Sequence, residues 1–148
     1  MKILLVEDDG YKAQALSEWL KSNFSDLEIV STSSYKEGCL TALDGFFDLL
    51  ILDMTLPLRV SEGRSSKETL VNGGELIIRE LLDEGMEFKA LIITQYETFN
   101  GETIEAIEER LIKMCGDRFL GCVGYNSQDD SWKTNLKNIM SYAEGFDS

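Results

Sequence analysis

The chain contains no histidine, one proline and only three cysteines in its 148 residues. Without histidine, Ser–His and Cys–His nucleophiles and histidine-ligated zinc sites are excluded. The cysteines are odd in number and form no Cys-x-x-Cys pair, so we expect reduced core thiols and a cytoplasmic protein. The opening MKILLVEDD reaches three acids after five apolar residues, which is typical of neither a signal peptide nor a membrane span.

Basic residues are also scarce. There are 14 lysines and arginines against 27 aspartates and glutamates, which gives a net charge of −13. Such a surface repels nucleic acid and anionic membranes, so we expect neither as a direct partner. It suits a metal cation or a basic protein, although many acidic proteins are acidic only for solubility.

The pattern of apolar residues predicts a single domain spanning residues 1–148, since 43% of the residues are hydrophobic. Five short apolar runs typical of buried strands alternate with five segments of helical spacing. This alternation predicts an α/β fold with a doubly wound five-stranded parallel sheet and helices on both faces. The expected strands are Ile3–Val6, Leu27–Thr32, Leu49–Leu52, Ala90–Ile93 and Phe119–Val123, and the expected helices are Tyr11–Asn23, a segment capped by Ser34, Gly74–Glu84, Glu102–Cys115 and Trp132–Tyr142.

One segment does not follow this alternation. Residues 58–73, LRVSEGRSSKETLVNG, are polar and lack periodicity. Loops of that length are uncommon in compact domains unless they are functional or mobile. We therefore expect a loop insertion at about residues 58–73.

In the stretch DLLILDMTLP, residues 48–57, Asp53 follows four apolar residues. This pattern predicts a strand buried on both faces, with Asp53 at its carboxyl end. Glu7 and Asp8 follow the first strand, and Thr94 ends the fourth. In a doubly wound sheet the first and third strands are neighbours, and ligands bind beyond their carboxyl ends.

Three crowded carboxylates repel one another unless a cation lies between them, and Mg²⁺ prefers such oxygen ligands. A carboxylate on Mg²⁺ can act as a nucleophile towards a phosphoryl group, and the Thr94 hydroxyl is placed to bond a phosphoryl oxygen. One acid alone is better explained as a solvated strand end, but the set of three favours a metal site. Thr94 alone is explained equally well as a β-branched residue ending a strand.

The pieces KILLVEDD, DLLILDMTLP and ALIITQ, in this order and spacing, make the chain similar to the receiver domains of two-component response regulators. The resemblance covers nearly the whole chain and implies the flavodoxin-like strand order 2-1-3-4-5. It also implies a stand-alone phosphoacceptor rather than an enzyme in the ordinary sense. The partners would be a histidine kinase or phosphotransfer protein and an output protein, and a homodimer is compatible with it.

The same resemblance implies roles for individual residues. Asp53 would receive the phosphoryl group, and Thr94 would be the switch hydroxyl. Mg²⁺ would be held by Glu7, Asp8, Asp53 and the backbone carbonyl of Thr55. Asp9 is a poorer ligand, because the residue after the acid pair usually begins the turn.

Several positions depart from the family pattern. The lysine that ends the fifth strand in the family is replaced by Gly124, or by Cys122 if the register shifts by two. The family usually has a small residue after the switch hydroxyl, whereas this chain has the larger Gln95. The family also has a glycine shortly after the phosphoacceptor, and here the corresponding glycine is Gly73 or Gly74, after the insertion. The insertion carries three residues that could replace the missing cation, Arg59, Arg64 and Lys67, although each is better explained as part of a solvated loop whose basic residues pair with nearby acids.

Two functions are therefore kept open. The first is a stand-alone receiver that is phosphorylated on Asp53 and signals through a partner. The alternative is a pseudo-receiver, a binding module that does not switch by phosphorylation, which Gly124 and Gln95 favour. A haloacid-dehalogenase-like phosphatase is disfavoured, because Thr55 stands where most such enzymes place a second aspartate.

Overall fold

The computed structural model describes residues 1–61, 64–65, 68–95, 98–99 and 101–147. A five-stranded parallel sheet lies at its centre, in the order β11-β8-β3-β1-β2. In chain order this is 2-1-3-4-5, so the predicted fold class and strand order are confirmed. The strands are β1 (Lys2–Val6), β2 (Glu28–Thr32), β3 (Leu49–Leu52), β8 (Ala90–Thr94) and β11 (Phe119–Gly124).

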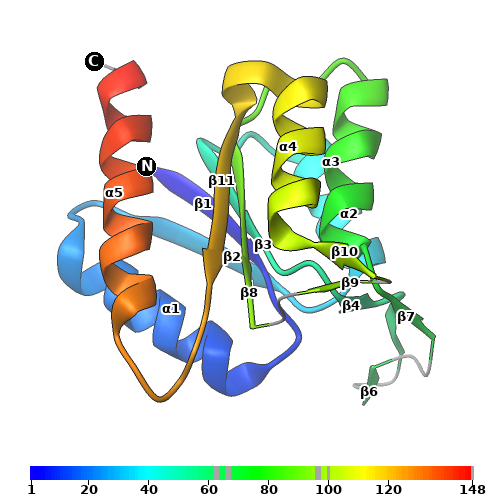
Figure 1. Ribbon diagram of the computed structural model, residues 1–148, viewed down its shortest axis with the longest axis horizontal. Helices are drawn as coiled ribbons and strands as arrows, with labels where there is room; N and C mark the ends of the chain where they lie inside the picture. The colour runs from blue at the N-terminus through cyan, green and yellow to red at the C-terminus, as the bar shows by residue number, and fades with distance from the viewer. Residues whose placement is uncertain (62–63, 66–67, 96–97, 100, 148) are drawn as a thin grey trace.

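Helices cover both faces of this sheet (Figure 1). On one face lie α1 and α5, and on the other lie α2, α3 and α4. Side chains of successive strand residues point to opposite faces, so the central strands are buried on both sides. The helices are α1 (Gly10–Asn23), α2 (Tyr35–Asp44), α3 (Gly73–Asp83), α4 (Ile104–Cys115) and α5 (Ser131–Asp147), with a 3₁₀ turn at Gly116–Arg118.

Side-chain caps fix where the helices begin. Asp9 accepts hydrogen bonds from the backbone N–H groups of Tyr11 and Lys12, which starts α1. Ser34 accepts from the N–H of Glu37, as its predicted role requires. Thr103 caps α4, so this helix starts two residues later than the expected Glu102.

Two β-ribbons extend the domain beside the carboxyl ends of the strands. Within the expected loop insertion, β4 (Leu56–Pro57) pairs with β7 (Thr69–Leu70), and β5 (Val60–Ser61) pairs with β6 (Arg64–Ser65), both antiparallel. This segment is thus a ribbon rather than an irregular loop. A second antiparallel pair, β9 (Thr98–Phe99) with β10 (Glu102–Thr103), precedes α4.

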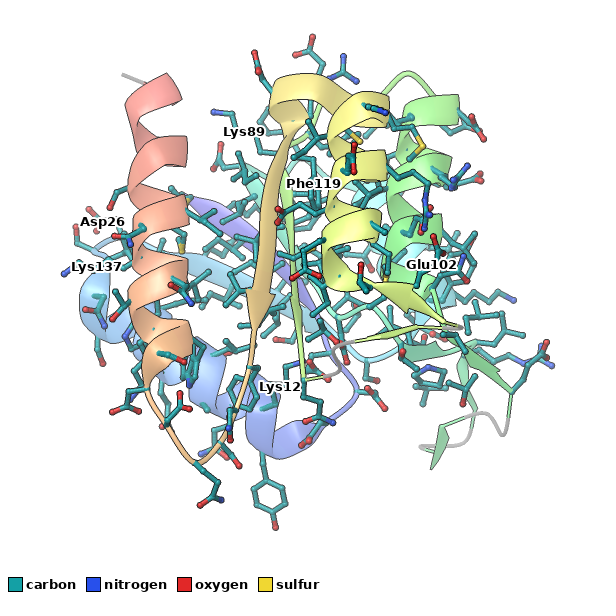
Figure 2. All side chains as sticks on the ribbon, viewed as in Figure 1. Lys12, Asp26, Lys89, Glu102, Phe119 and Lys137 are labelled. Carbon is teal, nitrogen blue, oxygen red and sulfur yellow. The ribbon has the colours of Figure 1, made fainter. Side chains whose placement is uncertain are left out.

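A buried carboxylate joins α3 to α4. Glu75 is 1% exposed and accepts hydrogen bonds from Arg110 at 3.0 and 2.7 Å and from Arg79 at 3.1 and 2.9 Å. Arg110 also pairs with Glu102 of β10, which Figure 2 labels near the start of α4. Burial raises the pKa of Glu75, but the two guanidinium groups outweigh it and hold this pKa below its ordinary value.

Within the described residues, none of the helices combines the length and apolar character needed to span a bilayer.

Replacing Glu75 with glutamine should lower the free energy of unfolding at pH 7 by about 1–3 kcal/mol, because charged hydrogen bonds to two arginines are weakened. The folded pKa of Glu75 is depressed, so its stabilisation is fully present above the unfolded value of about 4.3. It is lost as pH falls through the folded pKa. Urea denaturation at neutral and acidic pH measures both effects.

The matched control is Glu109→Gln, which removes an exposed carboxylate 3.9 Å from Lys113 on the outer face of α4. It should change stability little at either pH. Equal losses in the two variants, or a Glu75 effect that persists in acid, would contradict the buried ion-pair account.

Candidate functional site

Three carboxylates from two neighbouring strands meet at the carboxyl edge of the sheet. Val6 and Leu52 are paired in the β1–β3 register, so Glu7 and Asp53 leave the sheet at the same level. Glu7, Asp8 and Asp53 each offer an oxygen, and these three oxygens lie within 4.8 Å of one another. The structure therefore brings together the three acids that the sequence pattern predicts to converge.

Asp53 is held firmly in this cluster. Its side chain is 8% exposed, its N–H donates to the Val6 carbonyl at 2.9 Å, and its Oδ1 accepts from the N–H of Met54 at 2.8 Å. Glu7 is buried as well, whereas Asp8 is exposed at the rim. The cluster thus has a closed inner wall and one side open to solvent.

Asp9 does not join the acid set. It caps α1, and its own N–H donates to Glu7 Oε2 at 3.1 Å. Asp9 thus starts the turn into α1, and a residue in the first turn of this helix contacts Glu7 and Asp53.

Lys12, in that first turn, is the residue that sequence reasoning missed. Its side chain is 2% exposed, and its Nζ lies 2.5 Å from Glu7 Oε1 and 3.4 Å from Asp53 Oδ1. The ammonium also donates to the Ile93 carbonyl at 2.9 Å and lies 5.6 Å from the centre of the Tyr125 ring. Figure 2 shows Lys12 at the edge of the sheet where β8 and β11 end.

A signal for Lys12 was present in the sequence. Lys12 precedes Leu16 by four residues and Leu20 by eight, and both leucines are fully buried. At this spacing all three residues share the inner face of α1. A lysine is also disfavoured by the helix dipole in a first turn, so a lysine buried there indicates anionic partners.

Burial raises the pKa of Glu7 to about 7; Lys12 opposes this shift, and the charge of Asp53 adds to it. Burial likewise raises the pKa of Asp53, again against the effect of Lys12. The pKa of Asp8 is raised by burial and by the neighbouring Glu7. One ammonium therefore does not fully compensate three crowded carboxylates.

The far wall of the site is formed by β8 and β11. Thr94 is 1% exposed and pairs with Gly124 in the sheet register, and the Thr94 carbonyl accepts from the N–H of Tyr125 at 2.8 Å. A pocket of ≈ 480 Å³ lies there, so the space beside Gly124 is open rather than filled by a lysine side chain. It is lined by Thr94, Gln95, Ile104, Gly124, Tyr125, Asn126 and Ser127.

Among the described side chains, the cation that contacts the acids comes from α1 and not from the insertion. Arg59 is exposed, while Lys12 from α1 contacts both Glu7 and Asp53. Lys67 and the side chain of Arg64 lie outside the described part of the chain. The Thr55 hydroxyl donates to the Val71 carbonyl at 2.9 Å, and the metal-ligating role of the Thr55 backbone carbonyl stays a prediction.

The acid set fits a hard divalent cation in chemistry and nearly in size. Ligand oxygens on opposite sides of Mg²⁺ lie about 4.2 Å apart, because each Mg–O bond is about 2.1 Å. The 4.8 Å spread of the three oxygens is therefore closed by small side-chain rotations. The Lys12 ammonium beside Glu7 and Asp53 opposes full coordination, because it repels a divalent cation.

Gly74 lets α3 begin directly against Asp53. A Cβ at this position would lie 2.4 Å from the Asp53 carbonyl oxygen, and the Gly74 N–H donates to the Met54 carbonyl at 2.9 Å. Of the two glycines left open by the sequence, Gly74 is thus the one in contact with the Asp53 backbone, while Gly73 packs against Leu56.

Comparisons with known proteins found relatives along nearly the whole chain at 28% and 29% identity. No protein-family profile matches the chain. The Detocs response regulatory protein DtcB of Enterobacter cloacae is 28% identical over 92% of this chain and 95% of its own length. The uncharacterised protein y4jR of Sinorhizobium fredii is 29% identical over 93% of this chain and 95% of its own length.

Among solved structures, the receiver domain of the Francisella response regulator 1452 matches with a TM-score of 0.63 at 12% identity, covering 98% of each chain. Response regulator TrrA of Thermotoga maritima, in complex with Mg²⁺ and BeF, matches with a TM-score of 0.58 at 21% identity, covering 93% of this chain and 97% of that chain. These likenesses establish the fold.

Gly74→Ala should lower the free energy of unfolding by about 1–3 kcal/mol, because the added methyl group must push the Asp53 backbone away. The matched control is Gly10→Ala in the first turn of α1, where an added Cβ meets nothing within 4 Å. Chemical denaturation of both variants checks this. A Gly74 variant as stable as the Gly10 variant would show that α3 does not begin in contact with Asp53.

Proposed function

We propose that this chain, which has the fold of the response regulator receiver domains, accepts a phosphoryl group on Asp53 and signals by binding another protein. The observation that carries the proposal is the convergence of the Glu7, Asp8 and Asp53 oxygens within 4.8 Å at the carboxyl edge of the sheet. A nucleophilic carboxylate, two further acids and the buried Thr94 supply the groups that phosphoryl transfer to an aspartate needs.

The reaction is a displacement at phosphorus. An oxygen of the Asp53 carboxylate forms a bond to the phosphorus of a phosphohistidine on a histidine kinase or phosphotransfer protein, and the P–N bond breaks. The electron pair of that bond stays on the imidazole nitrogen, so the donor histidine is regenerated and Asp53 becomes an acyl phosphate.

Glu7, Asp8 and Asp53 are the residues that would hold Mg²⁺, together with the Thr55 carbonyl. When bound there, the ion would supply positive charge to the transferring phosphoryl oxygens. Meanwhile, the Val6 carbonyl and the Met54 N–H hold Asp53 in position for the incoming phosphorus atom.

The output is a change in protein binding. The Thr94 hydroxyl serves as the switch by bonding a phosphoryl oxygen, and the affected surface carries the signal to an output protein or a second copy of the chain. The net charge of −13 disfavours direct binding to nucleic acid or to an anionic membrane.

A pseudo-receiver, which binds partners without being phosphorylated, is the second candidate. Gly124 leaves the end of β11 without a cation, and Lys12 already neutralises part of the acid set. These two observations favour a site that is stable without metal or phosphate.

Incubation with Mg²⁺ and acetyl phosphate should add about 80 Da, the mass of one phosphoryl group, to the intact protein. Asp53→Asn should abolish this adduct, because an amide cannot form the acyl phosphate. Asp117→Asn, an exposed change in the 3₁₀ turn after α4, should retain it. Intact-mass spectrometry reads the result, and a native protein that stays unmodified with every donor favours the pseudo-receiver.

The affinity for Mg²⁺ should fall about tenfold or more in Asp8→Asn, because one anionic ligand of a hard cation is lost. In the native protein it should rise from about pH 6 to pH 8, since the metal needs Glu7 deprotonated and burial raises the pKa of Glu7 to about 7. Calorimetry at several pH values measures both, with Asp117→Asn as control. Equal affinity in native protein and Asp8→Asn would rule out the shared metal site.

A further inference from the structure

The contacts of Lys12 assign it a role in this site. The Lys12 side chain is only 2% exposed. It comes from α1 and not from β11, which ends at Gly124. Its ammonium lies closer to Glu7 than to Asp53. A fully buried ammonium is costly unless anions surround it, so its position is dictated by the acids.

Each oxygen of Glu7 faces a positively polarised group in this arrangement. Its Oε1 lies 2.5 Å from Lys12 Nζ, and its Oε2 accepts from the N–H of Asp9 at 3.1 Å. A metal ion ligated through Oε1 would lie next to the ammonium, and one ligated through Oε2 would share that oxygen with the Asp9 N–H. The ammonium is the one that repels a divalent cation, whereas the Asp9 N–H belongs to the turn that starts α1.

The same ammonium is within reach of a group on Asp53. Its Nζ is already 3.4 Å from Asp53 Oδ1, and a lysine side chain has four rotatable bonds. Tyr125 lies 5.6 Å away and is in turn packed against Trp132 at 5.3 Å, which closes the side of the pocket facing α5. A shift of the ammonium from Glu7 towards Asp53 would therefore leave it beside buried groups.

We propose that Lys12 is an internal counter-cation that competes with a divalent metal for Glu7 and, once displaced, binds the phosphoryl group on Asp53 in place of a lysine at Gly124. The site then exists in two charge arrangements. In the metal-free form the ammonium bridges Glu7 and Asp53; in the phosphorylated form the metal holds the acids and the ammonium holds the phosphoryl oxygens. The first half of this exchange is the competition between Lys12 and the metal for Glu7, and it does not depend on phosphorylation. The second half is the binding of Lys12 to the phosphoryl group, and it rests on the proposed phosphorylation of Asp53.

The test of the first half uses Mg²⁺ alone. Lys12→Gln removes the competing charge from a cluster of three carboxylates, so the affinity for Mg²⁺ measured by calorimetry should rise at least about tenfold. Lys2→Gln is the matched control, because it makes the same change in net charge where Lys2 pairs with Glu28 at the start of β1. An affinity in Lys12→Gln that is unchanged, lower, or raised only as much as in Lys2→Gln overturns the competition.

The Lys12→Gln protein has a second readout if it does not fold without metal, since its buried carboxylates then lack their cation. Circular dichroism during a Mg²⁺ titration follows folding directly. Folding induced by Mg²⁺ supports the competition, because the metal replaces the ammonium. A chain that stays unfolded at about 50 mM Mg²⁺ overturns it.

The test of the second half compares acetyl phosphate labelling at saturating Mg²⁺. The yield of phosphorylated protein should fall about tenfold or more in Lys12→Gln and stay unchanged in Lys2→Gln. Equal yields in native protein and Lys12→Gln overturn the role towards the phosphoryl group. If the native protein takes no phosphoryl group, the proposed function and this half fail together, whereas the Mg²⁺ result stands independently.

Discussion

The structure at the functional edge depends on one buried interaction, the ammonium of Lys12 between the carboxylates of Glu7 and Asp53. A third contact, to the Ile93 carbonyl, ties the same atom to β8. One side chain of α1 thus links the residues that follow β1 and β3 to β8. Without a cation the two carboxylates would face each other in a pocket closed to water, which is the most expensive arrangement for charged groups in a protein.

Other parts of the molecule are arranged around that edge. Gly74 allows α3 to start against the Asp53 carbonyl, and the next residue, Glu75, joins α3 to Arg110 of α4. A continuous series of contacts therefore runs from the acid cluster to the helix that follows the second ribbon.

The sequence carried enough information for the sheet and the acids, because both follow from local patterns. The runs before Glu7 and Asp53 are continuous and apolar, and parallel pairing of β1 with β3 then brings their ends together. The two ribbons were missed because strands of two residues, such as β4 and β9, leave no periodic signal.

Lys12 was missed for a different reason. The departures from the family pattern place the missing cation at Gly124 or in the insertion, and neither of these points to the inner face of α1. A lysine in a helix ordinarily lies on the solvated side, and only the tertiary contact with Glu7 explains why this one is buried. The register of Gly124 opposite Thr94 likewise became known only from the pairing of β8 with β11.

The most direct measurement of the central claim is a crystal structure of the protein grown with Mg²⁺ and beryllium fluoride, a mimic of the phosphoryl group. The account predicts a metal ion between Glu7, Asp8 and Asp53, the fluoride complex on Asp53, and Lys12 Nζ within about 3 Å of a fluorine atom and no longer in contact with Glu7. An acid cluster without metal or fluoride, with Lys12 still on Glu7 at saturating concentrations of both, would contradict it.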